Sequence, residues 1–148
     1  MIEKLRYQLA DKQTRGEVVL KLIEQLTINR GLVNETDDHH NTLLHYAAKY
    51  DGTDKLIKIL VEKGADLKAK NYQGNTPLHI AAANSIQNSI LLMQLGAKDN
   101  VINNEVYLPE DVFHQKFPHL SWFDIMPKPH IIFKGSHYEI VSPCVNTR

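Results

Sequence analysis

The stretch "NTLLHYAA" at residues 41–48 returns almost unchanged as "NTPLHIAA" at residues 75–82. The two stretches agree at six of their eight positions, and Thr42 lies 34 positions before Thr76. Self-similarity at a period of about 20–50 residues marks proteins that are built from stacked repeats. This internal repeat therefore decides how the rest of the chain is interpreted.

The residue types in each copy predict a pair of helices. Thr42 and Thr76 can cap a helix start, because a threonine hydroxyl accepts a hydrogen bond from a free N–H of the first turn. Pro77 suits the next position, since it has no N–H to leave unpaired. The paired alanines that close each stretch let two helices approach closely. Gly64 and Gly96 follow apolar runs and are expected to end the second helices in a left-handed conformation.

Both copies continue in the same way. "HNTLLHYAA" (40–48) is followed by "LIKILVEKGAD" (56–66), and "GNTPLHIAA" (74–82) by "ILLMQLGAK" (90–98). The T-P-L-H-x-A pattern and its spacing resemble the ankyrin repeat. We therefore interpret residues 37–100 as two ankyrin-like repeats.

The resemblance implies an all-α solenoid of stacked antiparallel helix pairs with hairpin-like loops. It also implies that His45 and His79 tie the start of each first helix to a neighbouring loop. We predict one repeat over 37–70 and the next over 71–100. The extra residues of the first copy, around "KYDGTD" (49–54), are expected in the turn between its helices.

The flanking segments are predicted to be degenerate capping repeats, at 1–36 and 101–127. The first has two apolar stripes at helical spacing. These stripes consist of Ile2, Leu5 and Leu9, and then of Val18, Val19, Leu22, Ile23 and Leu26. In the second, "LPEDVF" aligns with "TPLHIA" when Leu108 takes the place of the threonine. Residues 1–127 are thus expected to form one repeat domain.

The tip of each predicted hairpin differs between the copies. The position that is usually glycine is Gly74 in one copy, His40 in another and Val106 in the third. Histidine tolerates a positive φ better than most residues, whereas a β-branched residue tolerates it poorly. The third hairpin is therefore expected either to be distorted or to have a different register.

The tail, residues 128–148, departs from the helical period. "HIIF-KGS-HYEIV" predicts two short β-type runs around a glycine turn. A lone hairpin is only marginally stable in water. The tail is expected either to pack on the last repeat or to begin a further domain.

Composition narrows the classes of function. The formal net charge is zero, whereas nucleic-acid binders usually carry a basic excess, so no nucleic-acid partner is expected. The N-terminus lacks the apolar core of a secretory signal, and no segment suits a membrane span. A single cysteine fits a reducing compartment, so we expect the chain in the cytoplasm. We also expect it to be a monomer. Richness in Ile, Asn and Lys resembles ankyrin proteins of intracellular bacteria, which makes a host cytoplasm the alternative.

The resemblance places partner contacts at the hairpin tips and at the exposed ends of the first helices. Three tyrosines fall in this strip, and tyrosine is favoured at interface hot spots. Plain loop polarity is the alternative explanation. The expected partner-binding residues are Asp38, His39, Asn41, Lys49, Tyr50, Tyr72, Gln73, Asn75, Ala83, Asn84, Asn104, Glu105 and Tyr107.

Other chemistry is less well supported. His39, His40 and His45 are close in sequence, but no cysteine or carboxylate stands beside them at a zinc-type spacing, so no metal site is expected. Cys144 lacks the base and orienting group that a thiol nucleophile requires. Trp122 and Phe123 are expected to seal the end of the stack, with a docking patch as the alternative.

We therefore predict a non-enzymatic protein-interaction module, an adaptor or an inhibitor, without a cofactor. An extended surface of hairpin tips and first helices would bind the partner protein. The alternative is a targeting or regulatory ankyrin segment of a larger enzyme or of a secreted bacterial effector.

Overall fold

The computed structural model describes residues 2–127, 130–135 and 137–141. Within these residues the chain forms eight α-helices, one 3₁₀-helix and one two-stranded hairpin. The helices are α1 (Ile2–Ala10), α2 (Arg15–Ile28), η1 (Arg30–Asn34), α3 (Leu43–Lys49), α4 (Asp54–Glu62), α5 (Pro77–Asn84), α6 (Ile86–Gln94), α7 (Pro109–Lys116) and α8 (Trp122–Ile125). The strands are β1 (His130–Lys134) and β2 (His137–Val141), which pair antiparallel.

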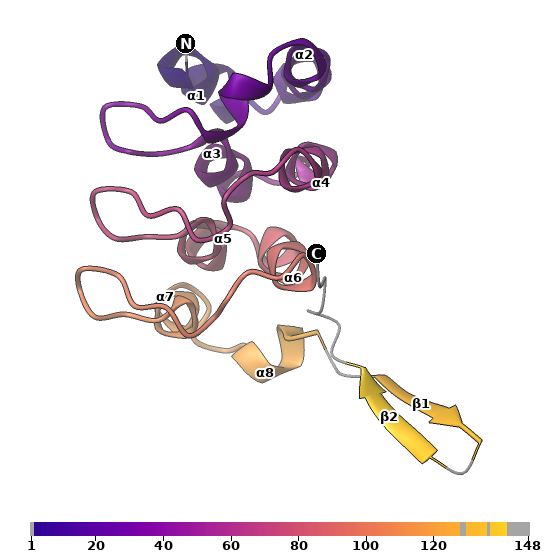
Figure 1. Cartoon of the computed structure of the whole chain (residues 1–148). Helices are drawn as coiled ribbons and strands as arrows, with labels where there is room; N and C mark the ends of the chain where they lie inside the picture. The colour runs from indigo at the N-terminus through magenta and orange to yellow at the C-terminus, as the bar shows by residue number, and fades with distance from the viewer. Residues whose placement is uncertain (1, 128–129, 136, 142–148) are drawn as a thin grey trace.

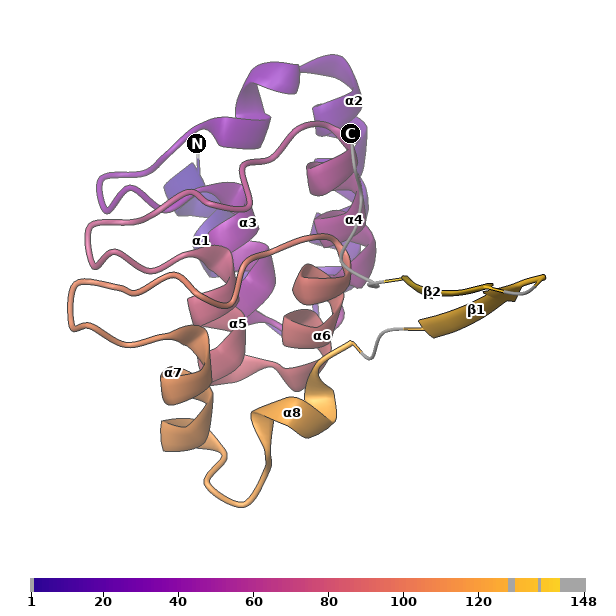
Figure 2. The ribbon, with the colours of Figure 1, turned by 60° about the horizontal axis from the view of Figure 1, so that its bottom comes forward.

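The helices stack in two rows, which confirms the predicted ankyrin-type solenoid. Figures 1 and 2 show α1, α3, α5 and α7 in an inner row, and α2, α4 and α6 in an outer row. Three long loops project from the inner row to the same side (Figure 1). We call them the first hairpin (35–42), the second hairpin (69–76) and the third hairpin (101–108).

The core lies between the two rows of helices. Ala47 and Ala48 of α3 are fully buried, as are the matching alanines of α5, and this lets adjacent inner helices pack closely. The predicted stripes of the first 36 residues also face the core, because Leu9 and Leu26 have no exposed surface.

The second helices end as the sequence predicts. Gly64 and Gly96 follow α4 and α6 with φ of 96° and 103°. After α4, the N–H of Ala65 donates to the carbonyl of Leu60 at 2.9 Å, which satisfies a carbonyl at the helix end. The extra residues of the first copy, 50–53, form the turn between α3 and α4.

Each inner helix of the two well-matched copies begins with a histidine that binds both its own helix start and the next hairpin. We call this arrangement a histidine joint. The N–H of Thr42 donates to Nδ1 of His45 at 3.1 Å, and Nε2 of His45 lies 2.9 Å from the carbonyl oxygen of Asn75. Because Nδ1 accepts, the ring proton is on Nε2 and is donated to that carbonyl. His79 reaches the carbonyl of Tyr107 in the same way, at 3.0 Å. The predicted role of both histidines is confirmed.

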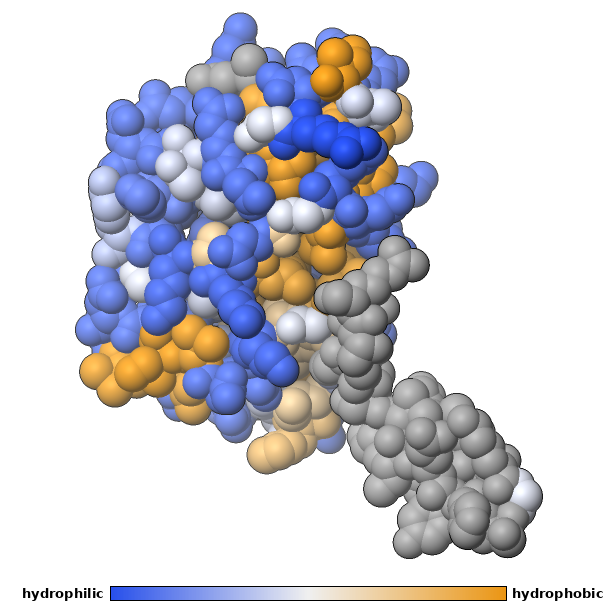
Figure 3. Space-filling model, in the orientation of Figure 1, coloured by the Kyte–Doolittle hydropathy of each residue, from blue (hydrophilic) through white to orange (hydrophobic). Residues whose placement is uncertain are grey.

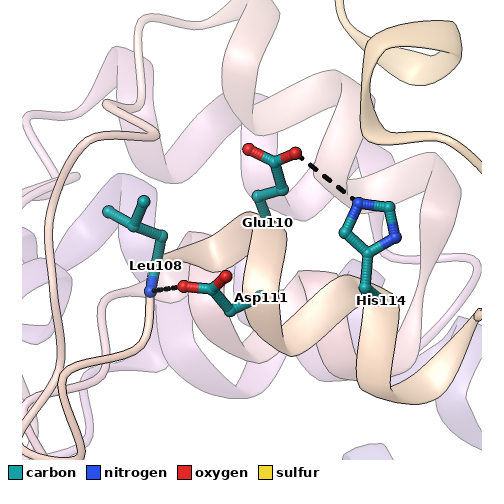
Figure 4. Close-up of polar contacts among 4 residues, drawn as sticks. All are labelled: Leu108, Glu110, Asp111 and His114. Atoms are coloured by element: carbon teal, nitrogen blue, oxygen red, sulfur yellow. Dashed lines mark hydrogen bonds and ion pairs between the residues drawn. The ribbon is translucent and has the colours of Figure 1, made fainter.

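In the C-terminal copy, Asp111 takes the place of the histidine at the start of α7, and we call this arrangement the aspartate joint. Leu108 precedes Pro109, which is the first residue of α7, so the predicted alignment of Leu108 with threonine is correct. The carboxylate of Asp111 accepts from the N–H of Leu108 at 2.8 Å (Figure 4). Glu110 lies 3.5 Å from His114 on the same helix. Asp111 thus caps its own helix.

The third hairpin is neither distorted nor shifted in register, so both sequence-based expectations for it were wrong. His40, Gly74 and Val106 occupy the same position, with φ of 60°, 74° and 66°. The N–H of Val106 donates to the carbonyl of Asn103 at 3.0 Å, as Gly74 does at its own position. The surrounding hydrogen bonds hold the valine in an unfavourable backbone conformation.

Side chains and backbone of neighbouring loops together enforce this conformation. The side-chain oxygen of Asn103 accepts from the N–H groups of Glu105 and Tyr107, at 3.0 and 2.9 Å. The N–H of Asn104 donates to the carbonyl of Gln73 in the preceding hairpin, at 3.0 Å. The third hairpin is therefore fixed both internally and to the second hairpin.

The last helix closes the stack with one of the two predicted aromatic residues. Trp122 is 1% exposed and packs edge-on against Phe113, with ring centroids 5.2 Å apart. Phe123 is 71% exposed, so its predicted sealing role is wrong. It follows Trp122 on a helix of only four residues, in which Trp122 is the buried residue.

The tail forms the predicted hairpin. β1 and β2 pair from His130 with Val141 to Lys134 with His137, around Gly135 at a φ of 64°. Figures 1 and 2 show this hairpin extending away from the helices. Cys144 lies outside the described residues.

Candidate functional site

A groove of about 400 Å³ lies on the inner-row face of the stack, beside the first and second hairpins. Its walls come from α1, from α3 and the residues next to it, from the second hairpin, and from α5. It therefore spans three successive helix pairs. The lining side chains are three tyrosines, three amides, two cations, His45, Ala10 and Ile80.

The tyrosines of the groove differ in how much of each side chain is exposed. Tyr7 on α1 is 68% exposed, whereas Tyr46 on α3 is 7% exposed and shows only part of its ring. The hydroxyl of Tyr46 donates to a carboxylate oxygen of Asp37. Tyr50 is half-buried at the end of α3. The groove thus offers one well-exposed aromatic ring and two more buried ones.

The contact between Asp37 and Tyr46 shifts the pKa values of both side chains. Burial raises the pKa of Asp37, but hydrogen bonds from Tyr46, Asn41 and His39 lower it more, so it stays below its usual value. Burial, together with Asp37, raises the pKa of Tyr46. The pair at neutral pH is therefore a carboxylate and a neutral phenol that donates to it.

Tyr50 is held by an arginine from the preceding helix pair. The guanidinium carbon of Arg15 lies 4.8 Å from the centre of the Tyr50 ring. Nε of Arg15 donates to the carbonyl of Leu9 at 2.6 Å, and another nitrogen donates to that of Asp51 at 2.8 Å. Tyr50 therefore joins two repeats as well as lining the groove.

Amide side chains link the hairpins at the edge of the groove. Nδ2 of Asn71 donates to Oδ1 of Asn41 at 2.9 Å, and Nδ2 of Asn103 donates to Oδ1 of Asn75 at 2.8 Å. The backbone is linked too, since the N–H of Tyr72 donates to the carbonyl of His39 at 3.1 Å. These bonds fix the spacing of the hairpins.

The hairpin tips form a second, smaller hollow of about 290 Å³. Tyr72 is 64% exposed there, and its ring centroid lies 4.5 Å from that of His40. His39 and Gln73 also line this hollow. The tips therefore present aromatic and amide groups together.

The structure distributes the predicted partner-binding residues over several places. Asn41, Lys49, Tyr50 and Gln73 line the groove. The others surround the groove or lie farther along the stack. Asp38, His39 and Tyr72 belong to the first two tips, Asn75 to the base of the second hairpin, Ala83 and Asn84 to the end of α5, and Asn104, Glu105 and Tyr107 to the third hairpin.

Sequence reasoning missed the contribution of α1 to the groove. Arg6, Tyr7 and Ala10 line it, as does Tyr46. The first capping repeat has no TPLH-type motif, so no alignment could assign inner-face positions there. A signal was present for Tyr46, because it directly follows the histidine of the motif in the first inner helix.

The described part of the chain shows neither a metal-binding cluster nor a membrane-spanning helix. No three histidine, cysteine or acidic side chains gather there as a metal-binding group. No helix among residues 2–127 is long and apolar enough to cross a membrane.

Comparison with known proteins identifies the family. The family model for ankyrin repeats in three copies matches residues 10–103. The chain is 33% identical to an ankyrin repeat-containing protein of Schizosaccharomyces pombe over 81% of its own length and 58% of that protein. It is 33% identical to the Notch-regulated ankyrin repeat-containing protein A of Danio rerio, over 62% of this chain and 81% of that protein.

The match to an ankyrin repeat protein of Fowlpox virus is 42% identical and covers 47% of this chain but only 13% of the viral protein. The chain thus spans 13% of the viral protein and 58% of the Schizosaccharomyces pombe protein. It belongs to the ankyrin repeat family. The repeats indicate a protein–protein interaction module, in a family that is generally non-catalytic.

Proposed function

We propose that the chain is an adaptor or inhibitor that binds one partner protein along the groove and the first two hairpin tips. The observation that supports this most directly is the groove itself, which three helix pairs build from tyrosine, amide and cationic side chains. Tyrosine and arginine are enriched at interface hot spots. Residues 1–127 would act as one unit, divided at 36, 70 and 100, with 128–148 as a separate tail.

The rigidity of the surface supports this role. Arg15 fixes Tyr50, and the amide links fix the first two hairpins relative to each other. A preorganised surface loses little conformational entropy on binding, which favours affinity. We further propose that the chain acts as a monomer in the cytoplasm, since its single cysteine suits a reducing compartment.

Affinity capture with matched variants tests the groove. Proteins captured from lysate by the unaltered chain are identified by mass spectrometry, and the capture is repeated with Tyr7→Ala/Gln73→Ala. Both residues are exposed, so the variant should fold normally. We expect captured partners to fall at least about tenfold, because hot-spot truncations cost about 2 kcal/mol or more.

The control changes the opposite face. Gln87 and Gln94 are exposed on the outer helix α6, and Gln87→Ala/Gln94→Ala should leave capture unchanged. Equal capture by both double variants would contradict the assignment of the groove.

A further inference from the structure

We infer that the groove selects an acidic segment of its partner, with aspartate or glutamate side chains seated against Arg6 and Lys49. This inference rests on the proposed function and specifies its partner chemistry. It is carried by the distribution of charge around the groove.

The charge of the groove differs from that of the whole chain. The chain has 17 basic and 17 acidic residues, yet the described residues that line the groove include Arg6 and Lys49 and no acidic side chain. In the part of the chain that the structure describes, no carboxylate lies within ion-pair distance of either cation. The ion pair found among the described residues, Glu110 with His114, lies on α7 and away from the groove.

Both cations are held over aromatic rings at the groove. The guanidinium of Arg6 lies 4.8 Å from the centre of the Tyr7 ring, and one of its nitrogens donates to the Tyr7 hydroxyl at 3.0 Å. The ammonium of Lys49 lies 5.6 Å from the centre of the Tyr50 ring. Stacking of this kind orients the charged group, and a guanidinium or ammonium held in this way can still donate to an anion.

Asp37, the carboxylate that binds Tyr46 beside the groove, already has its oxygens engaged by other donors. Asp37 accepts from the hydroxyl of Tyr46 and from the N–H groups of His39 and Asn41, the latter two at 2.9 and 2.8 Å. It therefore competes weakly for Arg6 and Lys49. An incoming carboxylate would supply the counter-charge that the groove lacks.

The remaining lining fits a polypeptide better than a nucleic acid. The side chain of Gln73 is exposed and can pair with the amides of an extended segment. Two cations would neutralise only two phosphates, too few for appreciable affinity to nucleic acid at physiological salt.

Selection from a random decapeptide library displayed on phage tests the inference. Peptides recovered by the unaltered chain should be enriched at least about threefold in Asp and Glu relative to the input. Arg6→Glu/Lys49→Glu should abolish that enrichment or turn it towards Lys and Arg. Synthetic copies of the recovered acidic peptides should bind the charge-reversed variant at least tenfold more weakly.

The control carries the same change of net charge elsewhere. Lys55 and Lys58 are exposed on the outer helix α4, so Lys55→Glu/Lys58→Glu should bind the same peptides within twofold of the unaltered chain. Equal loss in both charge variants would overturn the inference. Far-ultraviolet circular dichroism and thermal unfolding verify that both variants fold.

The outcomes separate the two proposals. Recovered peptides that lose affinity with Tyr7→Ala/Gln73→Ala but show no acidic enrichment would refute the inference and leave the groove as the binding site. Failure to recover any peptide that depends on the groove would refute both. Binding of a labelled oligothymidylate through Arg6 and Lys49, without acidic peptides, would also overturn the inference.

Discussion

The histidine joints at α3 and α5 and the aspartate joint at α7 each bind the N–H at the start of their own helix, but they differ in what else they bind. His45 fixes its own helix start with one ring nitrogen and the next hairpin with the other, and His79 does the same. Asp111 accepts only from its own helix start, at Leu108 (Figure 4). The histidine is thus a connector between repeats, whereas the aspartate caps its own helix.

The hairpin tips show a second difference between the repeats. Gly74 adopts its positive φ without strain, whereas Val106 adopts a similar value with a branched side chain. Figure 3 shows an apolar area over the third hairpin, at the lower left, whereas the first two hairpins are polar. Ile102 and Val106 are 48% and 70% exposed there. The tip residue thus varies between the hairpins without changing the sign of φ, and the third tip adds exposed apolar surface.

Removal of a histidine joint should have the largest effect. His45→Ala should lower the free energy of unfolding by about 2–4 kcal/mol, because it deletes buried hydrogen bonds and the packing of a buried ring, and leaves the Asn75 carbonyl with only its bond from the Asn71 N–H. Asp111→Ala should cost only about 1 kcal/mol, as expected for a helix cap. Urea unfolding followed by circular dichroism measures both, and equal losses would contradict the distinction between connector and cap.

Replacing Gly74 at the second tip with valine, the residue found at the third tip, should be the next most damaging change. Gly74→Val should cost about 2–3 kcal/mol, from the left-handed backbone and from steric overlap. A Cβ at Gly74 would lie 2.7 Å from the backbone nitrogen of Asn104 and would also overlap its side chain. The same urea titration checks this, with Gly52→Val as the control: its φ is 81°, but no atom lies within 4 Å of an added Cβ.

Acidification should weaken the histidine joints. Burial lowers the pKa of His45 and of His79 below the usual 6.5, so the folded chain binds fewer protons than the unfolded chain. Stability should therefore be constant above about pH 6.5 and should decline below it until the folded-state pKa values are reached. Urea midpoints between pH 7.5 and 5 measure the decline, and a His45→Gln/His79→Gln variant should show much less of it.

Relief of the strained valine should produce the smallest change, and a favourable one. Val106→Gly should raise the free energy of unfolding by about 0.5–1 kcal/mol, because glycine adopts the observed φ of 66° freely and the exposed valine side chain contributes little packing. Thermal unfolding should show a rise of a few degrees. A lower melting temperature would mean that the apolar tip stabilises the fold.

The sequence predicted the parts of the molecule that the repeat motif specifies. The helix starts at Thr42 and Thr76, the register of Leu108 and the hairpin of the tail follow from local rules that the structure obeys. The undistorted hairpin at Val106 could not be predicted, because cross-hairpin bonds such as that of Asn104 override local preference.

The groove was only half predictable for a similar reason. Lys49 and Tyr50 follow from the register of the repeat, whereas Arg6 and Tyr7 come from a helix without the motif. The placement of Tyr50 under Arg15 depends on the packing of α2 against the next pair, which no single stretch of sequence encodes.

The forward reach of the histidines has a consequence for biosynthesis. The carbonyl that His45 needs lies 30 residues later in the chain, and that of His79 lies 28 residues later. A nascent chain emerging from the ribosome N-terminus first must therefore wait for each succeeding loop before the preceding helix pair is locked. Translation would complete these joints in steps, whereas the cap at Asp111 forms within its own helix and needs no later part of the chain.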